Sequence, residues 1–280
     1  MYVLGVLDCG TTRETLEAVV DRTVDALSRE GRVGVVRYDA TIADGTPVAS
    51  EAGTLGGDVT YDLGADGDWT ACGTGMTVEE ALDQLTPTCE YAVVVGVPEL
   101  RHPTILVGPD ADREAESNDV VATVDTPADL DTETIRQTLE TTEPHQTLES
   151  LIERVKRSPN ADRAGAIATF TGRVRTKDTE DDTPTEYLEF EKYEGVADER
   201  MAALETDLER REGVLEVELY HRTGVVKSGE DIVFVVVLAG HREEAFRTVE
   251  DGINRLKDEV PLFKKEVTID DEFWVHERSA

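Results

Sequence analysis

The side chains in this sequence most able to do chemistry are basic residues in its C-terminal half. Lys257 and Lys264 are seven residues apart, with Pro261 between them. Because proline ends a helix, the chain can fold back there and bring both amines to one place. A lysine amine can serve as a base or as a nucleophile. The spacing therefore predicts a pair of amines at one reaction centre.

Further basic groups lie where predicted elements begin or end. Arg173 and Arg175 follow a strand that leaves its sheet through a glycine, and alternation points them the same way. His241 and Arg242 stand between an apolar strand and a helix, and Lys265 directly follows Lys264. In a chain with few basic residues, these groups together favour an anion-binding site.

Each basic residue also has an ordinary structural explanation. Arg173, Arg175 and Lys265 could be solvated surface charges. His241 and Arg242 could satisfy local carbonyls. Lys257, at the end of a predicted helix, would gain about 0.3–1 kcal/mol from the helix dipole alone.

The overall charge limits the class of function. The 280-residue chain has 61 acidic and 28 basic side chains and a net charge of -33. Such a surface repels phosphates, which argues against a nucleic-acid binder. At molar salt the Debye length falls to about 3 Å, so self-repulsion would be screened. We interpret the charge as adaptation to a salty cytoplasm, which predicts a halophilic protein.

The chain shows no targeting or membrane segment and no metal motif. No run of 18 apolar residues predicts a transmembrane helix, so a cytoplasmic protein is expected. Cys9, Cys72 and Cys89 form neither a CxxC motif nor a disulfide framework. All three precede residue 90, so the C-terminal half contains no thiol.

Basic residues divide the chain into two parts. Residues 1–144 contain 8 Arg and no Lys against 29 acids, whereas residues 145–280 contain 20 basic residues, including all seven lysines. Salt adaptation acting alone would deplete lysine everywhere. The polar stretch 141–146, with Pro144, is the predicted linker. Two domains are therefore expected, 1–144 and 145–280.

The N-terminal part has the pattern of an α/β domain. Strands are expected at 2–7, 33–37, 91–97, 104–107 and 120–124, a helix at 12–28, and a loop or hairpin over 42–73. Gly5, Gly10 and Thr12 fit a P-loop, but Thr11 occupies the lysine position. A nucleotide-binding fold kept as a scaffold is favoured, weak nucleotide binding stays open, and hydrolysis is disfavoured.

This part resembles the MobB-like P-loop proteins associated with molybdenum cofactor biosynthesis. The matching pieces are the strand–loop–helix, Gly34–Asp39 and the strand Tyr91–Gly96. The resemblance implies a degenerate P-loop-like α/β fold, because its one chemical motif is broken.

The C-terminal part has an α+β pattern. Helices are expected at 148–155, 197–211 and 243–257, and strands at 165–174, 186–193, 214–221 and 232–238. The turn Lys227–Glu230 is expected to join the last two strands.

Several strings in this part resemble the MoaE family, the large subunit of molybdopterin synthase. They are Gly165–Arg175, Leu188–Tyr193, His221–Gly224, Asp231–Val236, Ala239–Arg242, the Leu256–Glu266 segment and Trp274–Val275. The resemblance implies an α/β-hammerhead fold, a homodimer, and a small ubiquitin-like sulfur-carrier protein (MoaD-like) on each subunit.

The resemblance also implies a reaction and a site. Sulfur from the carrier's C-terminal glycine thiocarboxylate would convert cyclic pyranopterin monophosphate to the molybdopterin dithiolene, with no metal and no other cofactor. Lys257 and Lys264 match the catalytic pair. Positions matching substrate contacts are Arg173, Val174, Arg175, His241, Arg242, Lys265 and Glu266, and Arg278 is expected near them. The alternative is a scaffold that binds the carrier and other cofactor-assembly proteins.

Overall fold

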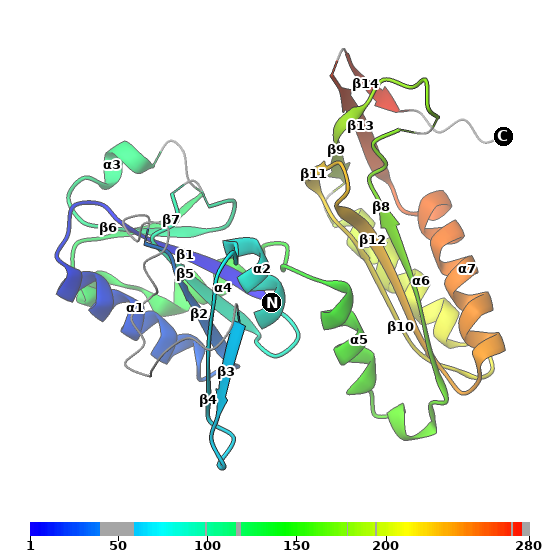
Figure 1. Cartoon of the computed structure of the whole chain (residues 1–280), viewed down its shortest axis with the longest axis horizontal. Coiled ribbons are helices and arrows are strands. Elements are labelled where there is room, and N and C mark those ends of the chain that lie inside the picture. Colours follow the sequence, from blue (N-terminus) through cyan, green and yellow to red (C-terminus); the bar gives the residue numbers. More distant parts are fainter. Residues whose placement is uncertain are drawn as a thin grey trace. The chain divides into compact units, whose positions relative to one another are not determined.

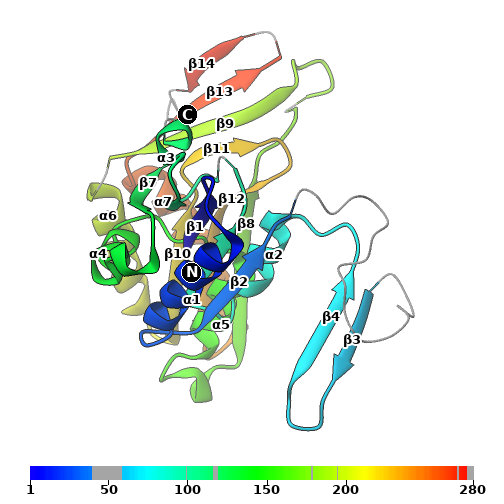
Figure 2. The ribbon, with the colours of Figure 1, turned by 90° about the vertical axis from the view of Figure 1, so that its left-hand side faces the viewer.

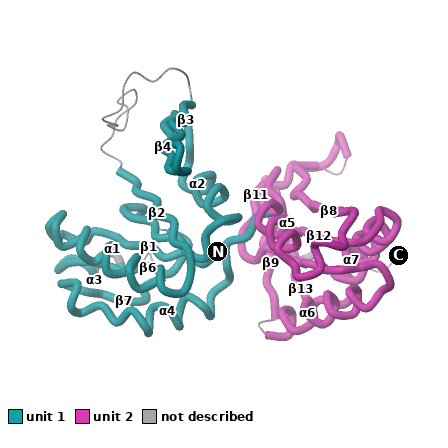
Figure 3. The backbone as a smooth tube through the Cα atoms, turned by 90° about the horizontal axis from the view of Figure 1, so that it is seen from below, with its two compact units in different colours: residues 1–147 teal, residues 148–280 magenta. Residues whose placement is uncertain are grey.

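The computed structural model describes residues 1–39, 59–98, 100–115, 119–177, 179–193, 195–269 and 271–275. The chain divides into two compact units, Met1–Thr147 and Leu148–Ala280 (Figure 3). The division falls three residues beyond the expected boundary after residue 144. Among the described residues, no helix combines the length and apolarity needed to cross a membrane.

Unit 1 is built on a parallel five-stranded sheet in the order β2-β5-β1-β6-β7 (Figure 1). Its strands are β1 (Tyr2–Asp8), β2 (Val33–Arg37), β5 (Tyr91–Val95), β6 (Thr104–Val107) and β7 (Val120–Val124). Central strands of such a sheet are buried on both faces, which explains their continuous Val, Ile and Leu runs.

Alternate residues of β1 pack into two different cores. Leu4 and Val6 face the core formed with α1 (Arg13–Leu27) and α4 (Thr132–Glu140). Val3 faces the other core, with Leu82 of α2 (Val78–Leu85). The helices therefore cover both faces of the sheet, as expected for an α/β unit. The short α3 (Ala111–Glu114) completes the helices described in unit 1.

The predicted loop or hairpin over 42–73 is a hairpin where it is described. β3 (Val59–Leu63) and β4 (Trp69–Gly73) pair antiparallel as a separate two-stranded sheet (Figure 2). Residues 42–58 of that prediction lie outside the described residues.

Unit 2 contains two antiparallel sheets, in the orders β10-β12-β8 and β11-β9-β13-β14. The first uses β8 (Ala166–Arg173), β10 (Val214–His221) and β12 (Asp231–Ala239); the second uses β9 (Thr185–Lys192), β11 (Gly224–Lys227), β13 (Leu262–Thr268) and β14 (Glu272–Val275). The helices are α5 (Leu148–Lys156), α6 (Val196–Glu209) and α7 (Arg242–Glu259). This arrangement is the α+β class expected from the sequence.

The three-stranded sheet is sandwiched between helices. In β12, Val235 and Val237 belong to the core shared with α6 and α7, whereas Val236 and Leu238 pack with α5. The alternation of a strand produces this division, because successive side chains point to opposite faces.

Two glutamates of α6 close the outer edge of β10. The backbone amides of Val217 and Leu219 donate to Glu209 (3.1 Å) and Glu205 (2.7 Å). Amides at a sheet edge otherwise remain open to pairing with another strand. In the described part of the chain, β8 has only β12 as a neighbour, so its other edge stays open.

One predicted connection is wrong. The turn Lys227–Glu230 joins β11 to β12, not β10 to β12, because the chain first crosses to the second sheet and pairs β11 with β9. A four-residue strand with only Val225 and Val226 as apolar residues is too short to stand out as a separate period-2 run.

Candidate functional site

Helix α7 runs back along the three-stranded sheet, so its first and last turns lie at opposite ends of that sheet. It begins three residues after β12 ends at Ala239, and Gly252 lies over Val235 in the middle of β12. The C-terminal turn of α7 therefore lies toward Asp231. We call the two ends of the sheet the Asp231 end and the Ala239 end.

The two candidate catalytic lysines belong to the Asp231 end. Lys257 is exposed in the last turn of α7, and Lys264 is half-buried in β13, which begins three residues after the helix ends. Among the described residues neither amine forms an ion pair, although acids outnumber bases about two to one in the chain. Both amines thus retain their hydrogen-bonding capacity for a ligand.

Arg173 is fixed at the same end by the turn that precedes β12. Its Nε lies 3.0 Å from Asp231 Oδ1, and a terminal nitrogen donates to the Gly229 carbonyl. Val174 follows with a buried side chain, and its backbone bonds to Gly229 and Glu230. Arg175 is exposed beyond it. The turn therefore orients Arg173.

Strand alternation separates the residues that follow Lys264. Lys264 and Glu266 share one face of β13, opposite Phe190 and Leu188 of β9. Lys265 lies on the other face, where its amine pairs with Glu272 at 2.9 Å. Glu266 accepts a hydrogen bond from the Thr185 hydroxyl. The structure thus brings Lys264 and Glu266 to one surface and does not place Lys265 with them.

His221 is a buried imidazole behind this surface. Its Nδ1 lies 2.8 Å from the Arg222 carbonyl oxygen, and its ring packs edge-on against Phe190 with centroids 4.7 Å apart. Burial lowers the pKa of His221 to about 4, so the ring is neutral at neutral pH. Because Phe190 lies opposite Lys264, His221 supports the strand that carries this lysine.

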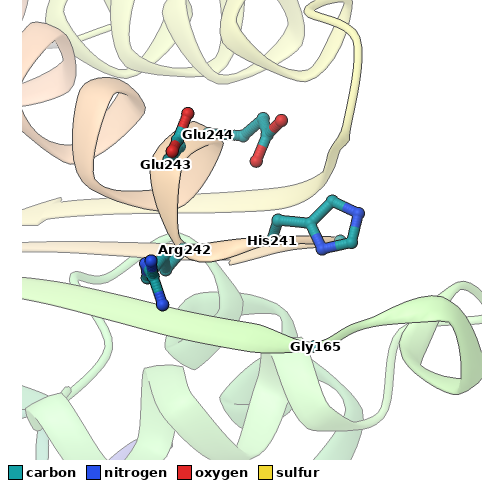
Figure 4. A pocket seen from close by; sticks show the side chains of 6 residues that line it. Gly165, His241, Arg242, Glu243 and Glu244 are labelled. Carbon is teal, nitrogen blue, oxygen red and sulfur yellow. The ribbon is translucent and has the colours of Figure 1, made fainter.

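At the Ala239 end, His241 and Arg242 line a hollow of about 550 Å³ at the start of α7. Its wall is completed by the backbone of Gly165 and Gly240 and by Glu243 and Glu244. Figure 4 shows Arg242 on one side of the helix start and the two glutamates on the other. Helix N-termini favour anions, and the two exposed basic side chains add to that preference.

The two clusters are far apart within one chain. Arg242 and Lys257 are separated by 15 residues of continuous helix, which corresponds to about 22 Å along the axis. The structure thus brings Arg173, Lys257 and Lys264 to one end but leaves His241 and Arg242 at the other. Arg278 lies outside the described residues.

The loop after β1 in unit 1 holds an internal anion. The amides of Gly10 and Thr11 both donate to Asp8 Oδ1, at 3.0 and 2.9 Å. In a P-loop such amides cradle phosphate. Asp110 adds a second carboxylate, since a Cβ built on Gly10 would lie 2.7 Å from its Oδ2. This loop therefore lacks the lysine of a P-loop, and it has carboxylates where a P-loop would hold phosphate.

Two residues with site contacts escaped the sequence reasoning. Asp231 anchors Arg173, and Glu244 lines the hollow beside His241. Nothing in the sequence separates these two carboxylates from the others in a chain with 61 acids. Across the described ranges, no three His, Cys, Asp or Glu side chains converge in a way that could hold a metal ion.

Comparison with known proteins gives the family. The family model described as MoaE protein matches residues 141–259. A probable molybdopterin synthase from Haloferax volcanii is 49% identical over 99% of this chain and 100% of its own length. The molybdopterin synthase catalytic subunit of Yersinia pestis is 34% identical over 42% of this chain and 78% of its own.

Among solved structures, a MobB protein homologue from Bacillus stearothermophilus covers 51% of this chain and 100% of its own, with 19% identity and a TM-score of 0.39. The relative from Haloferax volcanii matches both units of this chain in one polypeptide, and the relative from Yersinia pestis covers less than half of it. By its full-length match, the chain belongs to the MoaE family, the catalytic subunits of molybdopterin synthase.

Proposed function

We propose that this chain transfers sulfur from a thiocarboxylated, ubiquitin-like carrier protein to cyclic pyranopterin monophosphate and so forms the molybdopterin dithiolene. The observation that carries the proposal is the pair of amines, Lys257 and Lys264, at the Asp231 end. Both amines are without ion pairs among the described residues, and the anchored Arg173 lies at the same end.

The chemistry of unit 2 supports delivery of sulfur by a partner. Cys9, Cys72 and Cys89 all belong to unit 1, so unit 2 has no thiol that could hold sulfur as a persulfide. Each transfer converts one carrier thiocarboxylate to a carboxylate and leaves one sulfur on the substrate. Two loaded carriers are therefore consumed for each dithiolene.

The two lysines are assigned complementary roles. Lys257 moves protons or forms a transient acyl link with the carrier's terminal carbonyl. Lys264 polarises the substrate or assists the opening of its cyclic phosphate. The guanidinium groups of Arg173 and Arg175 bind the phosphate, because planar guanidinium donors match its oxygens.

The length of α7 leads to a site assembled from two copies of the chain. One copy cannot bring Arg242 within reach of Lys257 across about 22 Å of helix. In a two-fold dimer the same surface contacts itself in opposite directions, so the Ala239 end of one copy can meet the Asp231 end of its partner. A homodimer would thus bring the basic residues of the two ends together in one site. The open edge of β8 is available for such a contact.

The test is reconstitution with the full chain at molar KCl. Thiocarboxylated carrier and cyclic pyranopterin monophosphate are supplied, and molybdopterin is measured after conversion to a fluorescent derivative. Product that depends on the thiocarboxylate is expected. Binding of the carrier without product would instead support a scaffold that recruits cofactor-assembly proteins.

A further inference from the structure

One oxygen of Glu244 is buried in the wall of the hollow at the Ala239 end without a hydrogen-bond partner. Among the described residues, Glu244 Oε2 is the only buried side-chain oxygen or nitrogen that finds none. A buried carboxylate oxygen without a donor is unfavourable, because it has lost water and gained nothing in return. An N–H group in the hollow would remove this cost if the carboxylate rotated to turn this oxygen toward it.

The backbone is shaped to hold this side chain in place. Gly213 has a φ of +82°, and a Cβ at that position would lie 2.9 Å from Glu244 Cγ. The Gly213 carbonyl accepts the Gly240 amide at 2.8 Å, which ties this contact to the floor of the hollow. Glu244 therefore lies against a surface that any side chain at residue 213 would obstruct.

The dipole of α7 does not account for the burial. Glu243 also lies in the first turn, where an acidic side chain is favourable, yet its carboxylate stays in solvent near Arg247. A carboxylate needs only to be near the helix N-terminus for this benefit. Burial of the Glu244 oxygen is thus a separate feature.

The hollow is polarised in a way that matches the substrate. His241 and Arg242 present cationic or donor groups, whereas Glu244 presents an acceptor on another side of the helix start (Figure 4). Cyclic pyranopterin monophosphate has a phosphate at one end and an aminopyrimidine ring at the other. The 2-amino group and the adjacent ring N–H form a donor edge that is complementary to a carboxylate.

We infer that Glu244 binds the aminopyrimidine edge of the pterin and so determines which heterocycle enters the hollow. The inference rests on the proposed function, since it takes the pterin substrate from there. In the two-copy site, His241 and Arg242 join the arginines of the other copy at the phosphate end, and Glu244 fixes the orientation of the ring.

The test compares two fluorescent probes on the full chain at molar KCl. Pterin has the 2-amino group, and lumazine carries an oxygen in its place. Fluorescence titration should show pterin binding at least ~10-fold more tightly than lumazine, because a hydrogen bond to a charged group is lost with the amino group. Equal affinities for the two probes would overturn the inference without any mutation.

Variants then locate the preference. Glu244→Gln keeps the volume, removes the charge and should reduce the pterin preference to ~2-fold or less. Glu250→Gln removes the same charge from an exposed position of α7 and should keep the wild-type preference. If Glu244→Gln unfolds, the comparison in wild type still decides, and Glu244→Asp, which keeps the charge, tests a shortened reach.

Turnover separates the two proposals. In the reconstituted reaction, Glu244→Gln should raise the KM for the pterin substrate ~10-fold and leave the KM for the carrier unchanged. Wild-type turnover without discrimination between pterin and lumazine removes the role of Glu244 only. Discrimination without any turnover removes the sulfur-transfer proposal and leaves a pterin-binding site.

Discussion

Arg242 and Lys257 lie in the first and last turns of the same helix, α7, and point to different ends of the same sheet. A rigid helix keeps them about 22 Å apart whatever the rest of the chain does. Any reaction that needs both must therefore use residues from two chains.

Mixed dimers should show this arrangement directly. A chain with Arg242→Ala and a chain with Lys257→Ala are each expected to be inactive alone. Co-expressed, half of the dimers contain one copy of each, and one of their two sites has neither substitution. A two-fold arrangement thus predicts recovery of about a quarter of wild-type activity. Recovery absent from stable mixed dimers would contradict a shared site.

Removing either lysine should slow dithiolene formation by at least ~100-fold, the low end of the range for general acid–base catalysis. The variants are Lys257→Ala and Lys264→Ala, assayed by molybdopterin produced per chain. Lys156→Ala is the matched control, since Lys156 pairs with Glu153 on α5 and should retain wild-type turnover. Wild-type rates in either test variant would exclude that residue from catalysis.

Glu205→Gln should stabilise the protein at alkaline pH. Burial raises the pKa of Glu205 from 4.5 to about 7. A folded pKa above the unfolded value means that the contribution to stability is present at low pH and is lost as pH rises through 7. Glutamine cannot ionise, so at pH 8 it should raise the free energy of unfolding by up to about 3 kcal/mol.

The gain from Glu205→Gln should shrink to about 1 kcal/mol or less at pH 5, where the buried carboxyl is protonated. Denaturant unfolding at the two pH values measures both quantities. Glu250→Gln, at an exposed position, should show no such pH dependence. A variant that is less stable than wild type at pH 8 would show that the hydrogen bond from the Leu219 amide outweighs the charge.

Lowering the salt should destabilise the folded chain. A net charge of -33 repels itself when the Debye length grows from about 3 Å at 1 M to about 10 Å at 0.1 M. The Tm should therefore fall by several degrees from molar to 0.1 M KCl, and NaCl should act alike because screening depends on ionic strength. A Tm independent of salt would refute this explanation of the charge.

Unit 1 should contribute no nucleotide hydrolysis to sulfur transfer. Asp8 already accepts from the amides of Gly10 and Thr11, and Thr11 supplies no cation. Thr11→Lys alone should leave binding of Mg-ATP undetectable in equilibrium dialysis, whereas Asp8→Ala with Thr11→Lys should produce it. Hydrolysis by the wild-type chain coupled to molybdopterin formation would show that this loop works as a P-loop.

Much of the fold followed from apolar patterns. The bounds of β2, β6 and β7 match the predicted runs, because β-branched residues there are flanked by polar or glycine-containing segments. The helix α2 was missed although its signal was present. Thr77 and Glu80 form a capping box, the S/T-x-x-E pattern that marks a helix start.

The strand β13 carried no such signal. Its centre, Lys264-Lys265-Glu266, is charged, and only pairing with β9 and β14 makes it a strand. Tertiary context overrides local propensity in such segments. The separation of Lys264 from Lys265 onto opposite faces followed from that pairing, so the sequence alone grouped them together.

The cations proposed for the candidate site stand out in the sequence because basic residues are scarce in this chain. The separation of these cations to two ends of the sheet was not predicted, although the predicted helix 243–257 already had the length to separate Arg242 from Lys257. The contacts that orient them were beyond reach of the sequence, since Asp231 and Glu244 act through positions that only the fold brings close.

The glutamates that close β10 limit how copies of this sheet can associate. Glu205 and Glu209 occupy the outward amides at one edge, and within the described residues the edge of β8 remains open. Growth of a fibre through this sheet would need two open edges on every copy. With one edge closed, pairing of two β8 strands uses the remaining one, so addition of strands to this sheet ends at a pair of copies, even at high protein concentration.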